Sequence, residues 1–363
     1  MLTGQNGILN RAAEAKKKTE LAQEDENKTL QGYEDIMDQY TGNLPSRDET
    51  KPYFPNSNFS YKEGDLNSSL VIKDEDGNEY VWVEVPKTVN VYPTAGLKIT
   101  NFTDEEYTKI EDDLKEYTKD YKNNDYNDTN AQFIELYKNM LKSVYTNGGF
   151  WIGRYEAGYE IDKSKGETVR YYGDDYNTEH QIIQKMVIKK NTYPYNWVRR
   201  DQAQELAIGM NYEKTTSSLI FGIQWDLVLK YIETKNPDQK SNLILDSKKI
   251  GNYNNNLWNI TNGDAKFSND LGNDFTVCPY KKTLEESVLL TTGADSSFSL
   301  MNIYDLAGNV WEWTLEFFST IGPCVRRGGS YGNEGSSYPM KNCHSNDTNY
   351  SDSYIGFRIG LWK

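Results

Sequence analysis

The side chains best suited to metal binding and nucleophilic chemistry are scarce in this chain. It has three cysteines, Cys278, Cys324 and Cys343, and two histidines, His180 and His344. The cysteines lack the close pair spacing that holds zinc, and their odd number allows one disulfide with a free thiol, or three thiols. A histidine metal site or a Ser-His-Asp triad would have to use one of two widely separated histidines. The residue types therefore disfavour both kinds of catalysis.

Three short motifs near the C-terminus carry a resemblance to a known family. They are DLAGNVWEW at 305–313, RGGSY at 327–331 and GFR at 356–358. In this order they resemble the signature of the formylglycine-generating enzyme (sulfatase-modifying factor) family, D/N-x-x-G-N-x-W-E-W, R-G-G-S-[WY] and G-F-R. The resemblance implies a mixed α+β, C-type-lectin-like domain. It covers residues 67–363, with weaker motifs before Phe150.

Two positions after the second motif decide what the resemblance implies about catalysis. In the family, two cysteines in the pattern R-G-G-S-[WY]-x-C-x-x-x-x-C bind copper and activate oxygen. The corresponding positions here hold Asn333 and Tyr338, which cannot supply the thiolates that Cu(I) prefers. A sister group, the sulfoxide synthases of ergothioneine biosynthesis, needs a His-rich iron site, for which this chain has too few histidines. We therefore expect no copper, no iron and no catalysis; the alternative is a metal-dependent oxidoreductase of this family with a non-standard site.

The resemblance also implies a structural calcium ion. Four residues lie at positions that match the calcium site of the family: Asp305, Gly308, Val310 and Glu312. Two carboxylates and nearby backbone carbonyls form an oxygen-only ligand set, which suits Ca²⁺. The alternative is a capped turn with a solvent-facing acid. The other motif side chains should be structural, with Trp311 and Trp313 in the core and Arg327 and Arg358 in buried ion pairs or hydrogen bonds.

A polar segment, residues 332–354, lies between the second and third motifs and is rich in Asn, Ser and Tyr. This composition is typical of a binding loop, because Tyr supplies contact area at low entropic cost while Asn and Ser supply adaptable hydrogen bonds. In the C-type-lectin-like branch of the family this region is the ligand-facing surface, where diversity-generating retroelements place variable residues in phage receptor-binding and bacterial surface proteins. The alternative is a plain solvated loop. The predicted ligand-binding residues are Asn333, Glu334, Tyr338, Lys341, Asn342, His344, Asn346, Thr348 and Tyr350.

The N-terminal part of the chain predicts a helical stalk and a linker. Residues 1–42 combine a charged middle with apolar residues at three- to four-residue spacing near Tyr40, and residues 43–66 are rich in Pro, Asn and Ser. The stretch MLTGQNGILNRAAEAKKKTELAQ resembles the segment that follows the membrane helix in pilin-like proteins of Gram-positive bacteria. This resemblance implies a membrane-anchored full-length form and an extracellular or cell-surface location, bacterial or phage. The alternative is a cytoplasmic protein, if Met1 is the genuine start.

The elements that must position the motifs begin with a strand and a helical insertion. Alternation predicts a strand over 81–85, with the valines on one face and Trp82 on the other. A pair of helices over 103–145 interrupts the domain. The first helix should begin after Thr103, because this side chain and that of Glu106 can form a capping box.

Further along, the pattern predicts a strand from Phe150 and two helices that resemble structural helices of the family. One covers 197–210, with Asp201 as its cap, and the other covers 217–232. Residues 251–275 predict a long irregular loop, held by ions or by side-chain hydrogen bonds.

Charge and hydropathy limit the partners of this 363-residue chain. Its formal net charge is −14, and such a negative field repels phosphate backbones, so we expect no nucleic-acid partner. No stretch is apolar enough to span a bilayer. We therefore predict a non-catalytic recognition protein, of adhesin or receptor-binding type, whose partner is a cell-surface glycan or protein. A structural pilin-like subunit is the second alternative.

Overall fold

The computed structural model describes residue 16 and residues 52–121, 131–210 and 212–363. The predicted stalk and the linker up to residue 51 therefore lie outside the described residues, apart from Lys16. Everything from residue 52 onward belongs to one unit. No helix in the described part of the chain is long and apolar enough to cross a membrane.

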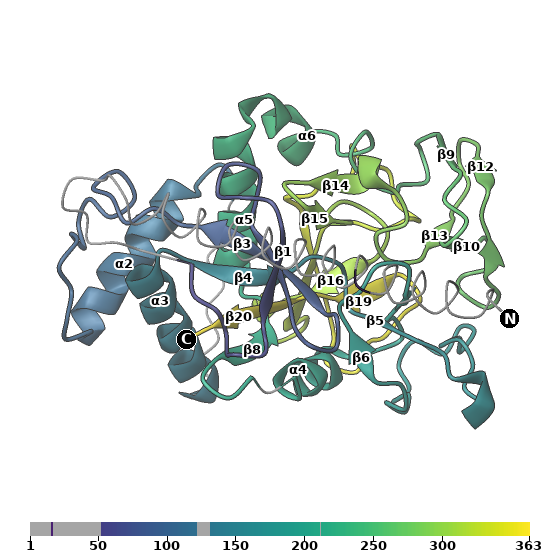
Figure 1. Ribbon diagram of the computed structural model, residues 1–363, viewed down its shortest axis with the longest axis horizontal. Helices are drawn as coiled ribbons and strands as arrows, with labels where there is room; N and C mark the ends of the chain where they lie inside the picture. Colours follow the sequence, from purple (N-terminus) through teal and green to yellow (C-terminus); the bar gives the residue numbers. More distant parts are fainter. Residues whose placement is uncertain (1–15, 17–51, 122–130, 211) are drawn as a thin grey trace, which may run out of the picture. The chain divides into compact units, whose positions relative to one another are not determined.

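An antiparallel sheet of six strands forms the centre of this unit (Figure 1). In spatial order its strands are β1 (Ser60–Glu63), β2 (Val71–Lys73), β3 (Glu79–Glu84), β4 (Gly149–Gly153), β20 (Ile359–Trp362) and β8 (Thr216–Leu219). The C-terminal strand β20 lies between β4 and β8, so the two ends of the unit meet in one sheet. Strand β1 falls within the segment 43–66, so the structured chain begins before the predicted boundary at residue 67.

The strands predicted over 81–85 and from Phe150 are confirmed as β3 and β4, which pair directly. Both faces of β3 are buried: Val81 and Val83 are fully buried on one face, and Trp82 is 2% exposed on the other. Trp82 packs edge-on against its register partner Trp151, with ring centroids 5.1 Å apart. The middle of the sheet is therefore buried on both faces, whereas its edge strand β1 is mostly exposed.

The helical insertion packs against this sheet. Helix α3 (Ala131–Asn147) contacts β4 and β20, helix α5 (Gly222–Lys235) contacts β3, and helix α2 (Asp104–Tyr117) contacts both helices (Figure 1). The predicted capping box is present, because Glu106 N donates to Thr103 Oγ1 at 3.3 Å and Thr103 N donates to Glu106 Oε2 at 2.8 Å. The remaining α-helices are α4 (Arg200–Ile208) and α6 (Lys240–Ile244).

Two details of the predicted helices were wrong. Helix α4 has Arg199 as its N-cap residue, with its N–H donating to Gln202 Oε1 at 3.2 Å, whereas Asp201 lies inside the first turn and binds the Arg199 guanidinium. The segment 217–232 begins as strand β8, because residues 216–219 pair with β20 and extend the sheet, and helix α5 starts only at Gly222. Pairing with a strand from the far end of the chain overrides the local helical pattern.

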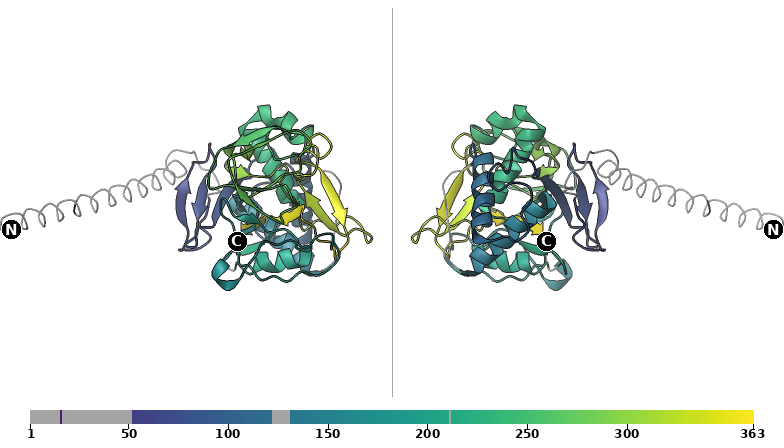
Figure 2. Two further views of the ribbon diagram at one scale, coloured as in Figure 1. Left: turned by 90° about the vertical axis from the view of Figure 1, so that its right-hand side faces the viewer. Right: turned by 90° about the vertical axis from the view of Figure 1, so that its left-hand side faces the viewer.

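Smaller sheets complete the unit. They are formed by β5 (Gly158–Tyr159), β6 (Met186–Val187) and β7 (Tyr193–Pro194), by β10 (Lys266–Ser268), β11 (Thr276–Val277) and β13 (Leu289–Leu290), by β9 (Trp258–Ile260) with β12 (Tyr280–Lys282), and by β14 (Ser299–Leu300) with β15 (Ile303–Tyr304). The predicted irregular loop 251–275 thus contains two short strands, β9 and β10, which enclose a small core of their own around Ile260 and Val288. Figure 2 shows the strands of residues 60–84 in purple and C-terminal strands in yellow on opposite sides of the unit.

Candidate ligand-binding surface

All three C-terminal motifs enter one four-stranded sheet. Its order is β18 (Cys343–Asn346), β17 (Cys324–Arg327), β16 (Trp311–Trp313) and β19 (Ile355–Phe357). Glu312 is the register partner of Arg327, and Arg326 is the register partner of both Trp313 and His344. Because side chains alternate along a strand, Glu312 and Arg327 share one face, and Arg326 and His344 share the other.

The first of these faces holds buried ion pairs. Arg358 donates from Nη2 to Glu312 Oε1 at 2.7 Å and from Nε to Glu312 Oε2 at 3.0 Å. Arg327 donates to both oxygens of Glu316, at 2.6 and 2.8 Å. Both arginines are at most 1% exposed, which confirms their predicted structural role. These motif residues hold the fold together and do not reach a ligand.

The two glycines that follow Arg327 turn the backbone sharply. Gly328 and Gly329 have φ values of 95° and 78°, where residues with a side chain are strained. A Cβ atom on Gly329 would also lie 2.8 Å from the Tyr253 ring and from the Tyr338 carbonyl oxygen. The R-G-G sequence is therefore explained by the close passage of the backbone at these two positions.

A buried acidic cluster, defined here as Glu156, Asp305 and Glu312, lies around Arg358. Asn309 Nδ2 donates to Glu156 Oε2 at 2.7 Å, and Gly293 N donates to Asp305 Oδ2 at 2.6 Å. Burial raises the pKa of Asp305 to about 7, and the charge of Glu312 acts in the same direction. Burial and then the charge of Asp305 raise the pKa of Glu156 well above its usual value. One arginine thus faces three carboxyl groups that do not all stay ionised at neutral pH.

The predicted calcium ligands belong to this region, where their side chains and N–H groups take part in other contacts. Glu312 is engaged by Arg358, Asp305 accepts from Gly293, and the N–H of Val310 donates to Glu156 Oε1 at 3.1 Å. The N–H of Gly308 donates to the Gly328 carbonyl. Across residues 52–121, 131–210 and 212–363, no group of three or more His, Cys, Asp or Glu side chains is arranged to hold a metal ion. Structural calcium stays a prediction that chelation can test.

The two positions that carry copper ligands in the family have other roles here. Asn333 Oδ1 accepts from Ser330 N at 3.0 Å and from Ser330 Oγ at 2.9 Å, which braces a turn. The Tyr338 ring packs edge-on against Trp311, at a centroid distance of 5.4 Å. Cys278 and Cys324 are free thiols in the described part of the chain. Burial raises the pKa of the Cys278 and Cys324 thiols, so neither is poised as a thiolate at neutral pH.

Several predicted ligand residues shape the loop through backbone groups. The Glu334 carbonyl accepts from Tyr338 N at 3.0 Å, although its side chain is exposed. Lys341 N donates to the Leu243 carbonyl, and the Lys341 carbonyl accepts from Arg327 at 2.8 Å. Asn342 Nδ2 donates to a carbonyl within the same loop at 3.1 Å. Together with Asn333, these residues position the loop, and of this group the exposed Glu334 side chain is best placed to meet a ligand.

Other predicted residues gather on the second face of the sheet, in what we call the aromatic–arginine cluster: Trp311, Arg326, Tyr338, His344 and Tyr350. The Arg326 guanidinium lies 5.0 Å from the Trp311 ring centroid and 5.8 Å from that of Tyr350. The His344 ring is 6.3 Å from Trp311 and 6.4 Å from Tyr338. His344 is exposed, Tyr338 and Tyr350 are half-buried, and Trp311 is only 3% exposed. Trp311 is thus the buried member of the cluster, and the rings of Tyr338, His344 and Tyr350 are accessible.

Asn346 and Thr348 complete the predicted set. Asn346 follows His344 by two residues on β18, so it lies on the same face, and its Oδ1 atom is buried without a hydrogen-bond partner among the described residues. Thr348 is exposed on the turn that follows β18.

Sequence reasoning missed Arg326 and the aromatic residues behind it. Tyr176 stacks on Tyr350, with ring centroids 6.2 Å apart, and on Trp197 at 5.9 Å. The signal for Arg326 was present: in a strand, neighbours face opposite sides, so two consecutive arginines cannot both be buried structural residues of one face. Nothing in the sequence indicated that residues 172–197 would pack beside the cluster.

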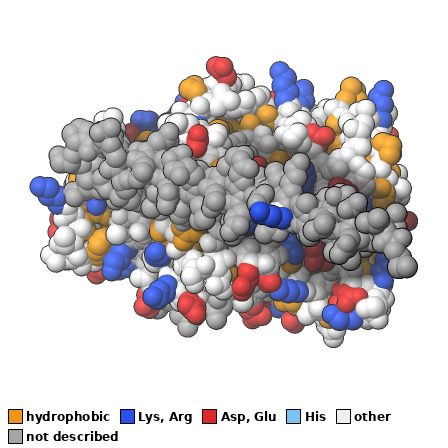
Figure 3. All heavy atoms as spheres, in the orientation of Figure 1, with side chains coloured by type: hydrophobic (Ala, Val, Ile, Leu, Met, Phe, Trp, Pro, Cys, Tyr) orange, Lys and Arg blue, Asp and Glu red, His pale blue; other side chains and the backbone are white. Residues whose placement is uncertain are grey.

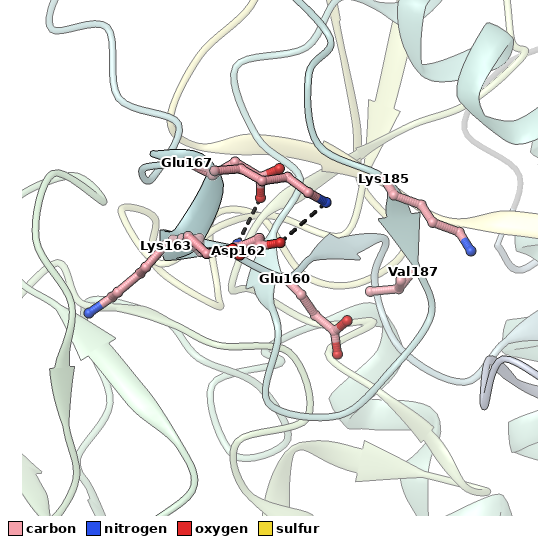
Figure 4. Close-up of a pocket in the computed structure, with 9 residues that line it drawn as sticks. Glu160, Asp162, Lys163, Glu167, Lys185 and Val187 are labelled. Atoms are coloured by element: carbon pink, nitrogen blue, oxygen red, sulfur yellow. Dashed lines mark hydrogen bonds and ion pairs between the residues drawn. The ribbon is translucent and has the colours of Figure 1, made fainter.

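The structure also has a shallow pocket of about 770 Å³ beside β5 and β6 (Figure 4). Its charged groups mostly satisfy one another, because Asp162 pairs with Lys165 at 3.2 Å and accepts from Ser164, and Glu167 accepts from the Asp162 N–H at 2.8 Å. The side chains of Lys163 and Lys185 point away from each other. Figure 3 shows acidic and basic side chains interspersed over the visible described surface, without a large patch of one sign in that view. Neither feature rivals the aromatic–arginine cluster as a binding site.

Comparisons with known proteins agree with the C-terminal motifs. Residues 246–360 match the family model of the sulfatase-modifying factor enzyme 1-like domain. No curated protein matches the chain. Among solved structures, the chain is similar to CarF, with 17% sequence identity and a TM-score of 0.28. The similarity covers 41% of this chain and 48% of CarF, so this chain spans about half the length of CarF.

Two further structures show similarity at the same level. PvdO from Pseudomonas aeruginosa is 14% identical with a TM-score of 0.35, over 60% of this chain and 82% of that chain. Treponema denticola variable protein 1 is 11% identical with a TM-score of 0.29, over 59% of this chain and 96% of that chain. Scores this low carry no argument about ligands or activity. The family match and the motif sheet agree with the predicted relationship: residues 246–360, which hold all three motifs, match a sulfatase-modifying factor enzyme 1-like domain.

Proposed function

We propose that this protein is a non-catalytic recognition protein that binds its ligand through the aromatic–arginine cluster. The observation that carries the proposal is the convergence of Tyr338, His344 and Tyr350 around Trp311 and Arg326. Trp311, Arg326 and His344 belong to strands of a sheet whose opposite face is held by buried ion pairs, and Tyr338 and Tyr350 contact them from the adjoining loop segments. Rigid aromatic side chains on such a base lose little conformational entropy on binding, which favours affinity.

The absence of catalysis is part of this proposal. The family positions for the copper ligands hold a turn-bracing Asn333 and a packed Tyr338, and burial keeps two of the three cysteines protonated. The third, Cys343 on β18, is the register partner of Arg327 on β17, whereas Cys324 is the register partner of Asn346; because side chains alternate, Cys343 and Cys324 lie on opposite faces of the sheet. The sulfurs are therefore not arranged as a soft metal pair.

We further propose that the protein acts outside the cytoplasmic membrane, on the surface of a bacterial cell or phage. This part rests on the resemblance of residues 1–23 to pilin-like proteins. The ligand would be a cell-surface glycan or protein.

A binding survey tests the proposal. The purified chain would be applied to arrays of bacterial and host glycans and of surface proteins, with calcium and with chelator. The variants Tyr338→Ala and His344→Ala should weaken any specific binding by about tenfold each, as truncation of interface anchors does. Lys281→Ala, an exposed change on β12, is the matched control and should bind normally.

Three results would argue against recognition by this surface. Binding that survives both variants would place the site elsewhere. Stoichiometric copper or iron in the purified protein would favour the oxidoreductase alternative. No binding by a folded protein, together with filament assembly of a membrane-anchored form, would favour a structural pilin-like subunit.

A further inference from the structure

Arg326 differs from every other described arginine because neither a carboxylate nor a backbone carbonyl accepts from it; its side chain contacts the Tyr350 hydroxyl. Arg154, Arg199, Arg327 and Arg358 pair with carboxylates, and Arg170 and Arg200 donate to backbone carbonyls. Within residues 52–121, 131–210 and 212–363, no acid lies within 4.0 Å of the Arg326 guanidinium, and its buried Nε donates to no protein acceptor. An arginine stays charged in proteins, so this site holds a cation that lacks an anion.

Two aromatic rings lie close to the Arg326 guanidinium. Its central carbon is 5.0 Å from the Trp311 ring centroid and 5.8 Å from that of Tyr350. A guanidinium has five N–H donors, so the contact with Tyr350 leaves others that can donate to a ligand. Burial lowers the pKa of Arg326, and the nearby Tyr350 and Asp352 oppose this only in part, which is what a missing counter-charge produces.

A second unpaired polar atom lies on the same face. Asn346 Oδ1 is buried without a donor from the described residues, and Asn346 follows the register partner of Arg326 by two positions on β18. A buried donor and a buried acceptor without partners each destabilise the protein, so a ligand that supplies both an anion and a hydroxyl would satisfy two groups at once. The accessible rings of Tyr338, His344 and Tyr350 add flat surface for an apolar ring face.

We propose that the aromatic–arginine cluster is a subsite for a carboxylate-bearing sugar of an acidic glycan. The sugar carboxylate accepts two hydrogen bonds from Arg326, a ring hydroxyl donates to Asn346 Oδ1, and the sugar ring lies against His344 and Tyr338. A paired carboxylate and guanidinium form a strong, planar contact. An acidic peptide suits the site less well, because several carboxylates would meet a single cation on a protein of net charge −14.

This inference rests on the proposed recognition function and has its own test. The probes are glucuronic acid and N-acetylneuraminic acid as oligosaccharides, the methyl esters of the same sugars, and a poly-glutamate peptide. Affinity would be measured by calorimetry on the full chain, at low and at high salt. We expect the acids to bind and the esters to bind at least about tenfold more weakly, since the ester loses the charge-assisted pair. Arg326→Gln should cause a similar loss, and Arg326→Lys a smaller one, because lysine keeps the charge but not the planar fork.

Lys281→Gln, which makes the same charge change on β12, is the control and should leave the affinity unchanged. If esters and acids bind equally and Arg326→Gln has no effect, while Tyr338→Ala still weakens binding, the carboxylate subsite is refuted and recognition by the surface stands. Preferential binding of the peptide also refutes it. If no saccharide binds to the folded protein, the acidic-glycan subsite is refuted together with glycan recognition. Thermal melting of each variant separates loss of binding from loss of fold.

Discussion

Replacing Lys282 by Met should destabilise the protein by about 3 kcal/mol, because this lysine is a buried cation that ties a loop together. Lys282 is 1% exposed, and its Nζ donates to the carbonyls of Asn256 at 2.7 Å and Asn254 at 2.9 Å. Burial lowers the pKa of Lys282 to about 8, so it is still an ammonium at pH 7. The predicted loop 251–275 is therefore held partly by side-chain hydrogen bonds from Lys282.

The magnitude follows from the bonds that the substitution removes. Each hydrogen bond from a charged donor contributes about 1.5–3 kcal/mol, and each buried carbonyl left without a donor costs a similar amount. The release of a buried charge offsets part of this loss, which leaves roughly 3 kcal/mol. Because Asn254 N and Nδ2 donate to the carbonyls of Asn333 and Gly332, the damage should reach the base of the ligand loop.

The assay is urea unfolding at pH 7, followed by tryptophan fluorescence and by circular dichroism. Lys282→Met should lower the midpoint with an unchanged m-value. Lys281→Met, its exposed neighbour on β12, should change the free energy of unfolding by less than about 0.5 kcal/mol. If Lys282→Met is as stable as the unmodified protein, the ammonium does not hold this loop and the reasoning fails.

Three further predictions concern the motif region and the insertion. Glu316→Leu should lower the free energy of unfolding by about 3–5 kcal/mol, because the buried Arg327 guanidinium would keep only its more distant acid, Asp226. An unchanged free energy of unfolding would show that the Arg327–Glu316 pair does not stabilise the fold. Asp305→Asn keeps the acceptor for Gly293 and suits the positive φ of 59°, and it removes a group whose pKa is raised to about 7. Between about pH 4 and 7 the Asp305 carboxyl is protonated in the folded protein but ionised in the unfolded chain, so the free energy of unfolding falls as pH rises through that window. The variant should show a shallower fall and be more stable than the unmodified protein by roughly 2 kcal/mol at pH 8. If the variant is instead less stable at pH 8, and the difference grows when calcium is added, the result would support the calcium prediction. Thr103→Ala removes the capping box and should lower the free energy of unfolding by about 1 kcal/mol, with no change in ligand affinity. A changed affinity would show that the helical insertion takes part in binding.

Much of the motif sheet could be predicted because its residues can satisfy their chemistry in few ways. A buried arginine needs an acid, which is why Arg358 and Arg327 were recognised as structural before Glu312 and Glu316 were known as their partners. The capping box at Thr103 followed from local spacing alone.

Other features depend on contacts between distant parts of the chain. Residues 216–219 form β8 only because β20 pairs with them, and the sequence of 217–232 by itself favours a helix. Composition identified the loop 332–354 as polar, yet it could not distinguish Asn333, which braces a turn, from His344, which is exposed. Arg326 was not predicted because its lack of an acid partner among the described residues depends on how distant segments pack together.

The central claim is that the aromatic–arginine cluster binds a ligand, and one titration tests it most directly. The first ligand found in the survey would be titrated by calorimetry into the unmodified chain and into the double variant Tyr338→Ala/His344→Ala, each with calcium and with chelator. The account predicts that the double variant keeps its fold and loses about 100-fold or more in affinity, as expected for removal of two interface anchors. Equal affinity of the two folded proteins would contradict it and move the search for the function to another surface.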